Sequence, residues 1–231
     1  QLGNTFNYMS ERIKNLLRKV GLEEKKKREY ELSLIQQQVK PHFLYNTLDI
    51  IIKLSEMNKN IEAQRVAKRL AAYYKRSLSG TQEIITIEEE LKIVEDYLEL
   101  QKMRYDDLFE YTYDIDEEIK HMPILKLTLQ PLVENAIYHG LKYKDSLGSI
   151  LIKGVMCQSH IEIYVIDNGI GVKEEDKDKI VDLKTNPINH FGLYSVDHRI
   201  KLFFGEKYGI EFKSKYNKGT QIKITFPRSN I

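Results

Sequence analysis

The sequence predicts an α+β protein, in which a long N-terminal helix and a helical hairpin are followed by a two-layer α/β sandwich. Three observations predict this order. Apolar residues recur at spacings of three and four up to about residue 80, the spacing changes to two at residue 109, and helical and strand patterns alternate from there. Strands joined by hairpin-length turns, with helices between them, indicate a mainly antiparallel sheet covered on one face by helices.

The first helix carries the seam of a coiled coil. Its apolar positions recur in threes and fours, at Phe6, Met9, Ile13, Leu16 and Val20. Such a stripe needs a partner helix, and the charged stretch 23–29 then interrupts it. We therefore expect residues 1–22 to form a signal-transmitting, coiled-coil helix.

Residues 23–85 predict a helical hairpin. The seam resumes at Tyr30 and continues through Pro41, Leu44, Leu48 and Ile51. A turn follows at 58–60, and Gly80 is placed to end a second helix as a left-handed cap. The inward positions of that helix are predicted as Ala63, Ala67, Leu70, Tyr74 and Ser77. Two such helices bury little alone, so the pattern predicts a homodimer with a four-helix bundle.

Residues 86–231 predict the sandwich together with its leading helix. Thr86 and Glu89 form a capping box before a helix with inward positions Ile87, Leu91, Val94 and Leu98. Helical spacing returns over 125–136 and again over 193–204. Alternating segments predict strands over 109–115, 150–155, 161–166, 210–213 and 220–226.

Composition narrows the functional class. With 42% apolar and 30% charged residues among 231, the chain is typical of a globular protein, and a net charge of +2 does not favour a nucleic-acid partner. The single Cys157 cannot form an internal disulfide, and no apolar run is long enough to span a bilayer. We expect a cytoplasmic fragment, since Gln1 is not an initiating Met, of a protein that continues upstream into a membrane-spanning sensor.

Three C-terminal segments hold polar residues or glycines where core packing alone would not place them. PLVENAIYHG, residues 131–140, carries Asn135 and His139 on the flank of a helix, although a surface Asn is the simpler reading. In IDNGIG, residues 166–171, Asp167 is either a turn former or a fixed acceptor for an exocyclic amine such as that of adenine. Gly169 and Gly171 would let the backbone approach a ring, and the loop to residue 189 suggests a lid.

The third segment is FGLYSVDHRI, residues 191–200. Gly192 precedes a helix, and the free N–H groups at a helix start bind anions such as a phosphate chain. This signal is weak alone. The order and spacing of the three segments together are much more specific.

A histidine near the start of the hairpin is the other candidate. In VKPHFLYNTLD, residues 39–49, His42, Asn46 and Asp49 share one helical stripe beside the apolar seam. This stripe keeps His42 open to water, and a kink is expected near Pro41. A helix-surface histidine of no consequence is the alternative.

PLVENAIYHG, DNGIG, FGL and NKGT resemble the N, G1, G2 and G3 boxes of the GHKL (Bergerat-type) ATP-binding fold. KPHFLYNTLD resembles the phosphoacceptor box of LytS/YesM-type sensor histidine kinases, and residues 5–20 resemble the last helix of a HAMP linker. The resemblance implies ATP and Mg²⁺ as cofactors, with Asn135 holding the metal, Asp167 reading adenine and His42 accepting the γ-phosphoryl group. It extends the nucleotide site to His139, Gly169, Gly171, Gly192 and Thr220.

The sequence also departs from this family. Phe43 follows His42 where relatives often have an acid, so Asp49 is the expected base, and Asn46 would orient the ring or a water. Tyr138 replaces a common lysine of the N box, which would leave phosphate charge to Lys142 or the metal. Pro131 stands where ATP-hydrolysing members carry a glutamate, which favours transfer to His42 over hydrolysis.

The sequence thus predicts an ATP-dependent protein-histidine kinase of a two-component system. Its dimer would phosphorylate His42 and pass the phosphoryl group to an aspartate of a response regulator. Two alternatives stay open at this point, a degenerate kinase that acts as a nucleotide-sensing dimer module and a plain GHKL ATPase.

Overall fold

The computed structural model describes residues 11–14, 18–19, 41–78, 83–105, 108–173 and 191–228. The chain divides into two units, residues 1–46 and 47–231. Most of the coiled-coil helix expected over residues 1–22 lies outside the described residues, although 11–14 and 18–19 are helical. The cap at Gly80 and the kink before Pro41 also concern residues that are not described and stay predictions.

Helices α2 (Pro41–Glu56) and α3 (Asn60–Leu78) form the predicted hairpin. The turn between them is a Schellman motif with Asn58 in the left-handed region at φ 58°. The N–H of Lys59 donates to the carbonyl of Leu54 (2.8 Å), and that of Asn58 donates to Ser55 (3.0 Å). The turn predicted at residues 58–60 is confirmed, except that Asn60 already belongs to α3.

The buried face of α3 differs by one position from the predicted face. Its buried residues are Ala63, Val66, Leu70, Tyr73 and Ser77. Ala67 is exposed and Tyr74 is half-buried, so the prediction that both point inward was wrong. Both residue sets fit a helical period, and the choice is made by Tyr73, whose ring packs 6.2 Å from that of Tyr97.

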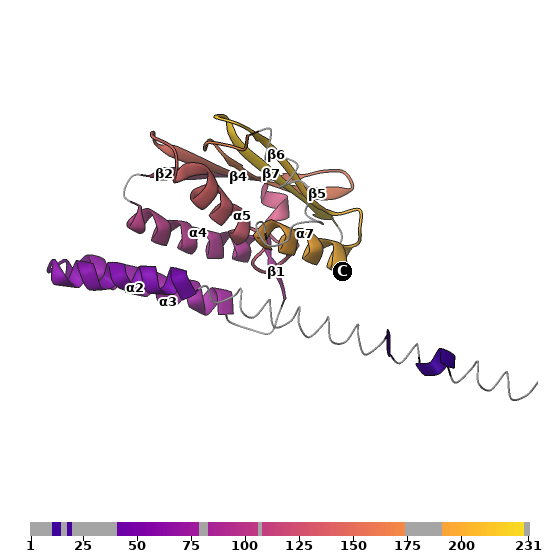
Figure 1. Ribbon diagram of the computed structural model, residues 1–231, viewed down its shortest axis with the longest axis horizontal. Helices are drawn as coiled ribbons and strands as arrows, with labels where there is room; N and C mark the ends of the chain where they lie inside the picture. Colours follow the sequence, from indigo (N-terminus) through magenta and orange to yellow (C-terminus); the bar gives the residue numbers. More distant parts are fainter. Residues whose placement is uncertain are drawn as a thin grey trace, which may run out of the picture. The chain divides into compact units, whose positions relative to one another are not determined.

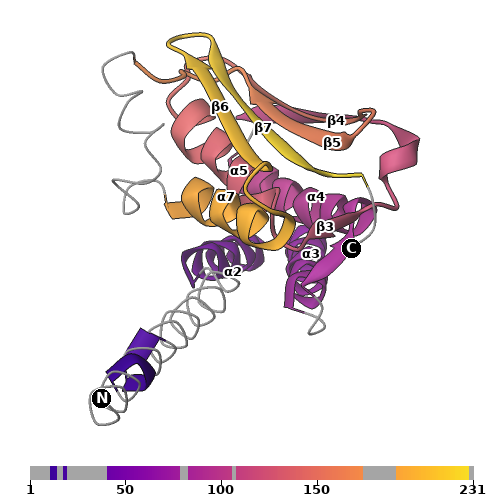
Figure 2. The ribbon, with the colours of Figure 1, turned by 90° about the vertical axis from the view of Figure 1, so that its right-hand side faces the viewer.

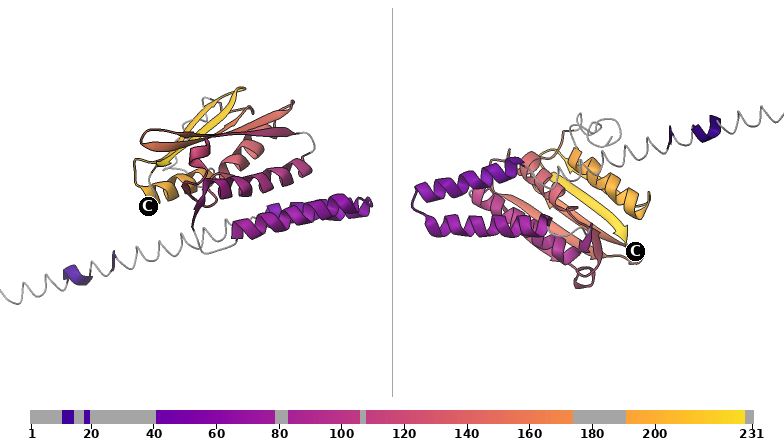
Figure 3. Two further views of the ribbon diagram at one scale, coloured as in Figure 1. Left: turned by 180° about the vertical axis from the view of Figure 1, so that it is seen from behind. Right: turned by 90° about the horizontal axis from the view of Figure 1, so that it is seen from below.

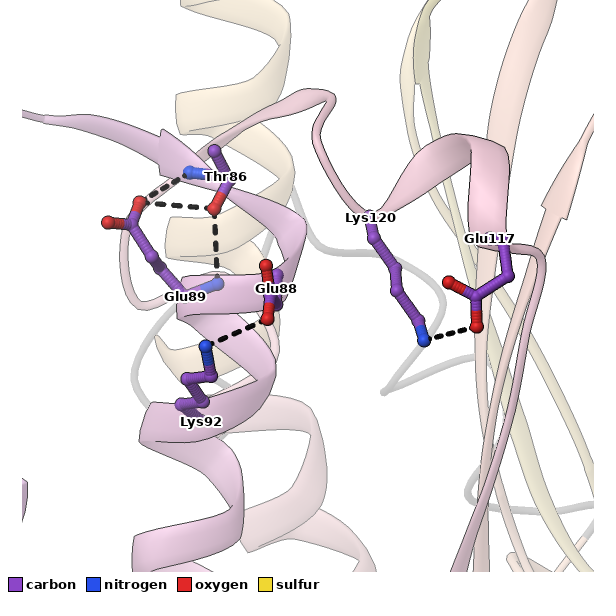
Figure 4. A network of polar contacts seen from close by, with 6 residues as sticks. All are labelled: Thr86, Glu88, Glu89, Lys92, Glu117 and Lys120. Carbon is purple, nitrogen blue, oxygen red and sulfur yellow. Dashed lines mark hydrogen bonds and ion pairs between the residues drawn. The ribbon is translucent and has the colours of Figure 1, made fainter.

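Helix α4 (Ile87–Arg104) begins as the sequence predicts (Figure 4). The N–H of Glu89 donates to the Thr86 hydroxyl (3.2 Å), and the N–H of Thr86 donates to the Glu89 carboxylate (2.9 Å). This reciprocal capping box satisfies two donors that a helix start otherwise leaves unpaired. Of the four predicted inward residues, only Leu91 is half-buried rather than buried.

A five-stranded sheet forms the second layer (Figure 1), in the order β2-β4-β5-β7-β6. Its strands are β2 (Phe109–Ile115), β4 (Gly148–Met156), β5 (His160–Asp167), β6 (Gly209–Lys215) and β7 (Gly219–Pro227). All pairs are antiparallel except β2 with β4. The mainly antiparallel sheet is confirmed, and the parallel pair is a detail that periodicity does not reveal.

Helices cover one face of this sheet. Figure 2 shows α4, α5 (Gln130–Asn135) and α7 (Phe191–Phe204) on the same side, and Figure 3 shows no described helix on the other. Along β5, Ile161, Ile163 and Val165 are buried and alternate with half-buried residues. The two-layer prediction is therefore confirmed, and no helix among the described residues is long and apolar enough to cross a membrane.

Leu125 was expected in a helix and lies instead in β3 (Pro123–Leu125), which pairs with β1 (Ile84–Thr86). The 3-10 turn η1 (Glu117–Ile119) precedes β3. Helix α5 begins only at Gln130 and continues without a break into η2 (Ala136–Leu141), a π-helical segment.

Glu90 holds the turn that leads into α5. Its carboxylate is fully buried and accepts the N–H groups of Leu127 and Leu129, each at 2.9 Å. Burial raises the pKa of Glu90, which these backbone hydrogen bonds partly offset. Leu127 adopts a left-handed φ of 58°, so the turn relies on this acceptor for its unusual backbone.

We expect Glu90→Ala to lower the free energy of unfolding by about 2 kcal/mol or more, because it leaves the buried N–H of Leu129 and the half-buried N–H of Leu127 unsatisfied. Urea unfolding measures the change. The matched control is Glu95→Ala on the exposed face of α4, with an expected change within about 0.5 kcal/mol. Equal effects of the two substitutions would contradict the role given to Glu90.

Candidate functional site

A cavity of about 140 Å³ lies where the end of β5, the start of β7, η2 and α7 meet. Its walls are mostly apolar, with a few polar groups that converge on the space. It is lined by Asn135, Ala136, His139, Gly140, Asp167, Gly171, Val172, Leu193, Phe212, Thr220 and Ile222. Five of the seven nucleotide-site residues expected from the sequence are therefore brought together here.

Asp167 is the buried charge of this cavity. The residue is only 6% exposed, and its Oδ1 accepts the N–H of Gly169 at 2.8 Å. Burial raises the pKa of Asp167 to about 6, although backbone N–H groups of Gly169 and Thr220 act in the opposite direction. A strongly perturbed group in a cleft is a mark of a functional site.

The carboxylate fits only because two glycines give it room. A Cβ on Gly140 would lie 2.8 Å from Asp167 Oδ1, and a Cβ on Gly169 would overlap the backbone of Gly140. The N–H of Ile170 then donates to the carbonyl of Gly140 at 3.1 Å, which joins η2 to the end of β5. Gly140 was not predicted as a site residue, although a glycine inside a helical pattern is a signal that could have indicated it.

Two further glycines shape the cavity rim. Gly171 has φ +62° and Gly219, in the NKGT segment, has φ +101°, and neither position has space for a Cβ. Gly219 stacks its backbone on that of Asp167, across the β5–β7 pair in which Asp167 faces Thr220. The hydroxyl oxygens of Thr220 and Ser214 are 2.9 Å apart, which fixes the Thr220 side chain at the cavity wall.

Asn135 ends α5 and lines the cavity with a half-buried side chain. Within the described residues its amide makes no hydrogen bond, so its oxygen is available to a ligand. An amide oxygen is a ligand that Mg²⁺ accepts when most of its other ligands are waters and phosphates. The residue therefore fits the metal-holding role that was expected of it.

The remaining predicted residues lie around the cavity. His139 lines it and is exposed, whereas Gly169 supports it through Gly140. A Cβ on Gly192 would lie 4.0 Å from the amide nitrogen of Asn135, so this glycine is a neighbour of the cavity rather than part of its wall. The lid expected up to residue 189 lies mostly outside the described residues.

Tyr138 does not line the cavity. Its hydroxyl accepts from Gln101 Nε2 (3.3 Å) and from Arg104 (3.2 Å), both on α4. The side chain that stands where relatives carry a lysine thus serves to hold η2 against α4.

His42 lies in the first turn of α2 and is exposed. The side-chain nitrogen of Asn46, one turn further on, is 2.9 Å from its Nδ1 and 3.0 Å from its Nε2. Asp49 is exposed as well and pairs with Lys53 at 2.7 Å. The expected openness of the imidazole and its contact with Asn46 are both present, and no contact between His42 and Asp49 is seen.

We expect Asp167→Asn to stabilise the protein without ligand, because it removes a buried charge. A raised pKa means that the folded state binds the proton more tightly, so stability falls as pH rises from about 4 to about 6 and is then constant. The raised pKa of Asp167 corresponds to about 3 kcal/mol of lost folding stability at pH 8. The stabilisation expected from Asp167→Asn therefore becomes smaller as the pH approaches 4.

Thermal and urea unfolding at pH 8 and pH 5 measure this difference. Asp145→Asn, at an exposed carboxylate, is the control and should leave stability nearly unchanged at both pH values. A gain from Asp167→Asn that does not depend on pH would contradict the assignment of the charge.

Two family models match successive parts of the chain. Residues 30–109 match the "Histidine kinase" family model, and residues 123–230 match that of "Histidine kinase-, DNA gyrase B-, and HSP90-like ATPase". The chain is 36% identical to the sensor histidine kinase YesM of Bacillus subtilis over 99% of its own length and 39% of that protein. It is 30% identical to the sensor protein kinase HptS of Staphylococcus aureus, over 100% of its own length and 45% of that protein.

Among solved structures, the histidine kinase domain of a blue-light activated kinase from Erythrobacter litoralis matches with a TM-score of 0.49 and 15% identity. That match covers 85% of this chain and 90% of the other. The chain spans less than half the length of the two curated relatives. With a histidine-kinase segment followed by a GHKL-type ATPase domain, the chain belongs to the sensor histidine kinase family of two-component systems.

Proposed function

We propose that the chain is an ATP-dependent protein kinase that phosphorylates its own His42. The observation that carries the proposal is a cavity with one buried carboxylate and one amide that makes no hydrogen bond within the described residues, in a chain that also presents an exposed imidazole. The Asp167 carboxylate would accept a hydrogen bond from the exocyclic amine of adenine, and the apolar walls of the cavity would enclose the adenine ring. The sites of ATP and Mg²⁺ would include His139, Gly171 and Thr220 beside Asn135 and Asp167.

Phosphoryl transfer needs positioning and charge neutralisation more than a strong base. Asn135 would hold Mg²⁺, which neutralises phosphate charge when it is bound. In the transfer, the bond from the γ-phosphorus to the bridging oxygen breaks, a bond to an imidazole nitrogen forms, and the ring loses a proton to solvent or a base.

Asn46 would set the nitrogen that reacts. An amide can turn either its oxygen or its nitrogen to a partner. With its oxygen toward the ring, Asn46 would accept a hydrogen bond from whichever ring nitrogen carries the proton and leave the lone pair of the other for the phosphorus; its contacts of 2.9 and 3.0 Å favour neither nitrogen. Asp49 lies two helical turns from His42, about 10 Å along the axis, so it would take up the proton through solvent rather than directly, and its exposed pair with Lys53 is easily opened.

The hairpin supports the proposed homodimer. Tyr45, Leu48 and Ile52 of α2 are 69%, 41% and 56% exposed and follow a spacing of three and four. An apolar stripe of this kind is covered when two hairpins form a four-helix bundle. Sensor histidine kinases typically dimerise and signal to response regulators, and we propose both partners for this chain.

Three segments would divide the work, residues 1–22 for signal input, 23–85 for dimerisation and phosphotransfer, and 86–231 for nucleotide binding. The relatives are more than twice as long as this chain. We propose that the full protein places a membrane-spanning sensor before this cytoplasmic part.

Incubation with γ-labelled ATP and Mg²⁺ tests the proposal. We expect acid-labile label on the protein, its complete loss in His42→Gln, and its loss in Asn135→Ala, whose hairpin should still form dimers. His121→Gln, at another exposed histidine, is the matched control and should keep the label. If the protein binds nucleotide but is never labelled, it is a sensing module. If it releases phosphate rapidly and is never labelled, it is an ATPase. Either result would refute the proposal.

Asp49→Asn should slow labelling by about 10²-fold, as is typical when a general base is removed. The rate is measured under single-turnover conditions, so that nucleotide binding does not mask it. Glu56→Gln, at an exposed acid of the same helix, should label at the normal rate. If Asp49→Asn labels equally fast, Asp49 is not the base.

A further inference from the structure

A second cluster of ligand atoms lies at the opposite end of β5 from Asp167. Cys157, His160 and Glu162 each offer one ligand atom, and these atoms all lie within 4.8 Å of one another. His160 and Asp167 are the first and last residues of β5, so about 23 Å of strand separates this cluster from the nucleotide cavity. We propose that the Cys157, His160 and Glu162 side chains form a binding site for Zn²⁺.

The β4–β5 turn sets the spacing of these three residues. The N–H of Cys157 donates to the carbonyl of His160 at 2.9 Å, so the two residues face each other across a turn of two residues, Gln158 and Ser159. Glu162 is two positions further along β5 and points to the same face as His160. The three ligands thus come from six consecutive residues of a rigid hairpin.

This face is the one that the described helices leave uncovered (Figure 3). Ile161 and Ile163 point the other way, into the core, whereas Cys157, His160 and Glu162 are all half-buried. A metal ion would therefore reach the cluster from solvent without opening the core.

The donor set matches zinc chemistry. Zn²⁺ prefers thiolate sulfur, imidazole nitrogen and carboxylate oxygen in tetrahedral arrangement, which places ligand atoms about 3.3 to 3.8 Å apart. His160 Nε2 and Glu162 Oε1 are already 3.2 Å apart, so small side-chain rotations bring all three ligands to one ion. A water would complete the coordination.

Neighbouring groups already hold the ligands as an outer shell would. The Tyr164 hydroxyl donates to Glu162 Oε2 at 2.6 Å and fixes that oxygen. Lys223 Nζ, 3.3 Å from Oε1, would have to release this oxygen to the ion. Ser159 Oγ is 3.1 Å from His160 Nδ1, so an Nδ1 proton can be donated to it and the Nε2 lone pair turned to the metal. Such contacts fix the tautomer and orientation of metal-binding histidines.

Charge and protons balance on binding. Glu162 would bind as a carboxylate, and Cys157 would release its thiol proton to solvent as the sulfur–zinc bond forms. One thiolate and one carboxylate then neutralise Zn²⁺. Lys223, now 3.3 Å from Glu162 Oε1, keeps its second partner, Glu211, at 2.7 Å.

Cobalt absorption provides a direct test, because Cys157 is the single cysteine of the chain. Titration of the untagged protein with Co²⁺, in a reductant without thiols, should produce a thiolate-to-cobalt band in the near ultraviolet. Zn²⁺ should abolish the band by displacement. No kinase activity enters this readout, so its outcome is independent of the proposed phosphoryl transfer.

Variants then test the three-ligand geometry. Cys157→Ser should give no band, and His160→Gln and Glu162→Gln should each weaken cobalt binding by at least about tenfold. His121→Gln is the matched control and should bind as the unchanged protein does, and far-ultraviolet circular dichroism checks that each variant is folded. Absence of the band at millimolar Co²⁺ would overturn the proposal. Unchanged cobalt affinity in a folded His160→Gln variant would also overturn it, because the band would then come from the thiol alone.

Discussion

The nucleotide domain depends on a carboxylate that is kept almost out of reach of water. Asp167 closes β5 at 6% exposure, and the surrounding backbone is arranged to tolerate it. Gly140 and Gly169 have no Cβ, which allows η2 to lie against the end of β5, and Gly219 allows β7 to approach Asp167 in the same way. Burial of this charge lowers the stability of the fold, and in the proposed function a ligand that pairs with the carboxylate would offset that cost.

Helix α5, which ends at the cavity, is joined to α3 of the hairpin by a series of buried polar contacts. The Tyr73 hydroxyl of α3 donates to Gln130 Oε1 at 3.0 Å, and Gln130 Nε2 donates to Glu134 at 2.9 Å, one residue before Asn135. Arg69 and Arg76 of α3 pair with Asp96 of α4 near this chain. Because buried polar contacts are costly when broken singly, a shift of α3 would disturb Gln130 and Glu134, which precede Asn135 in α5.

Much of this fold could be predicted from the sequence because local signals agree with tertiary packing. Thr86 and Glu89 form their capping box without help from the rest of the chain, and the alternation in 161–166 fixes which face of β5 is buried. Two features could not be predicted in this way, namely which face of a helix is buried and which strands pair. The choice of Tyr73 over Tyr74 depends on a ring of α4, and the parallel β2–β4 pair and the β3 strand at Leu125 depend on distant partners. Among the residues that line the cavity, Asn135, Asp167 and Gly171 were expected because their segments resemble the GHKL boxes, whereas Phe212 resembles an ordinary core position until the cavity is seen.

The cavity wall also bears on whether ATP would be transferred or hydrolysed. Hydrolysis needs a base that activates water near the γ-phosphorus. Among the described residues that line the cavity, only His139 and Asp167 can exchange a proton, and Asp167 is engaged by backbone N–H groups at the proposed adenine end. Glu134 adjoins Asn135 but is 7% exposed, accepts from Gln130 and does not line the cavity. Pro131 stands where ATP-hydrolysing relatives carry a glutamate, and His139 is the remaining described wall residue that could activate water. The absence of a carboxylate base from the described wall near Asn135 agrees with the proposed transfer to an imidazole.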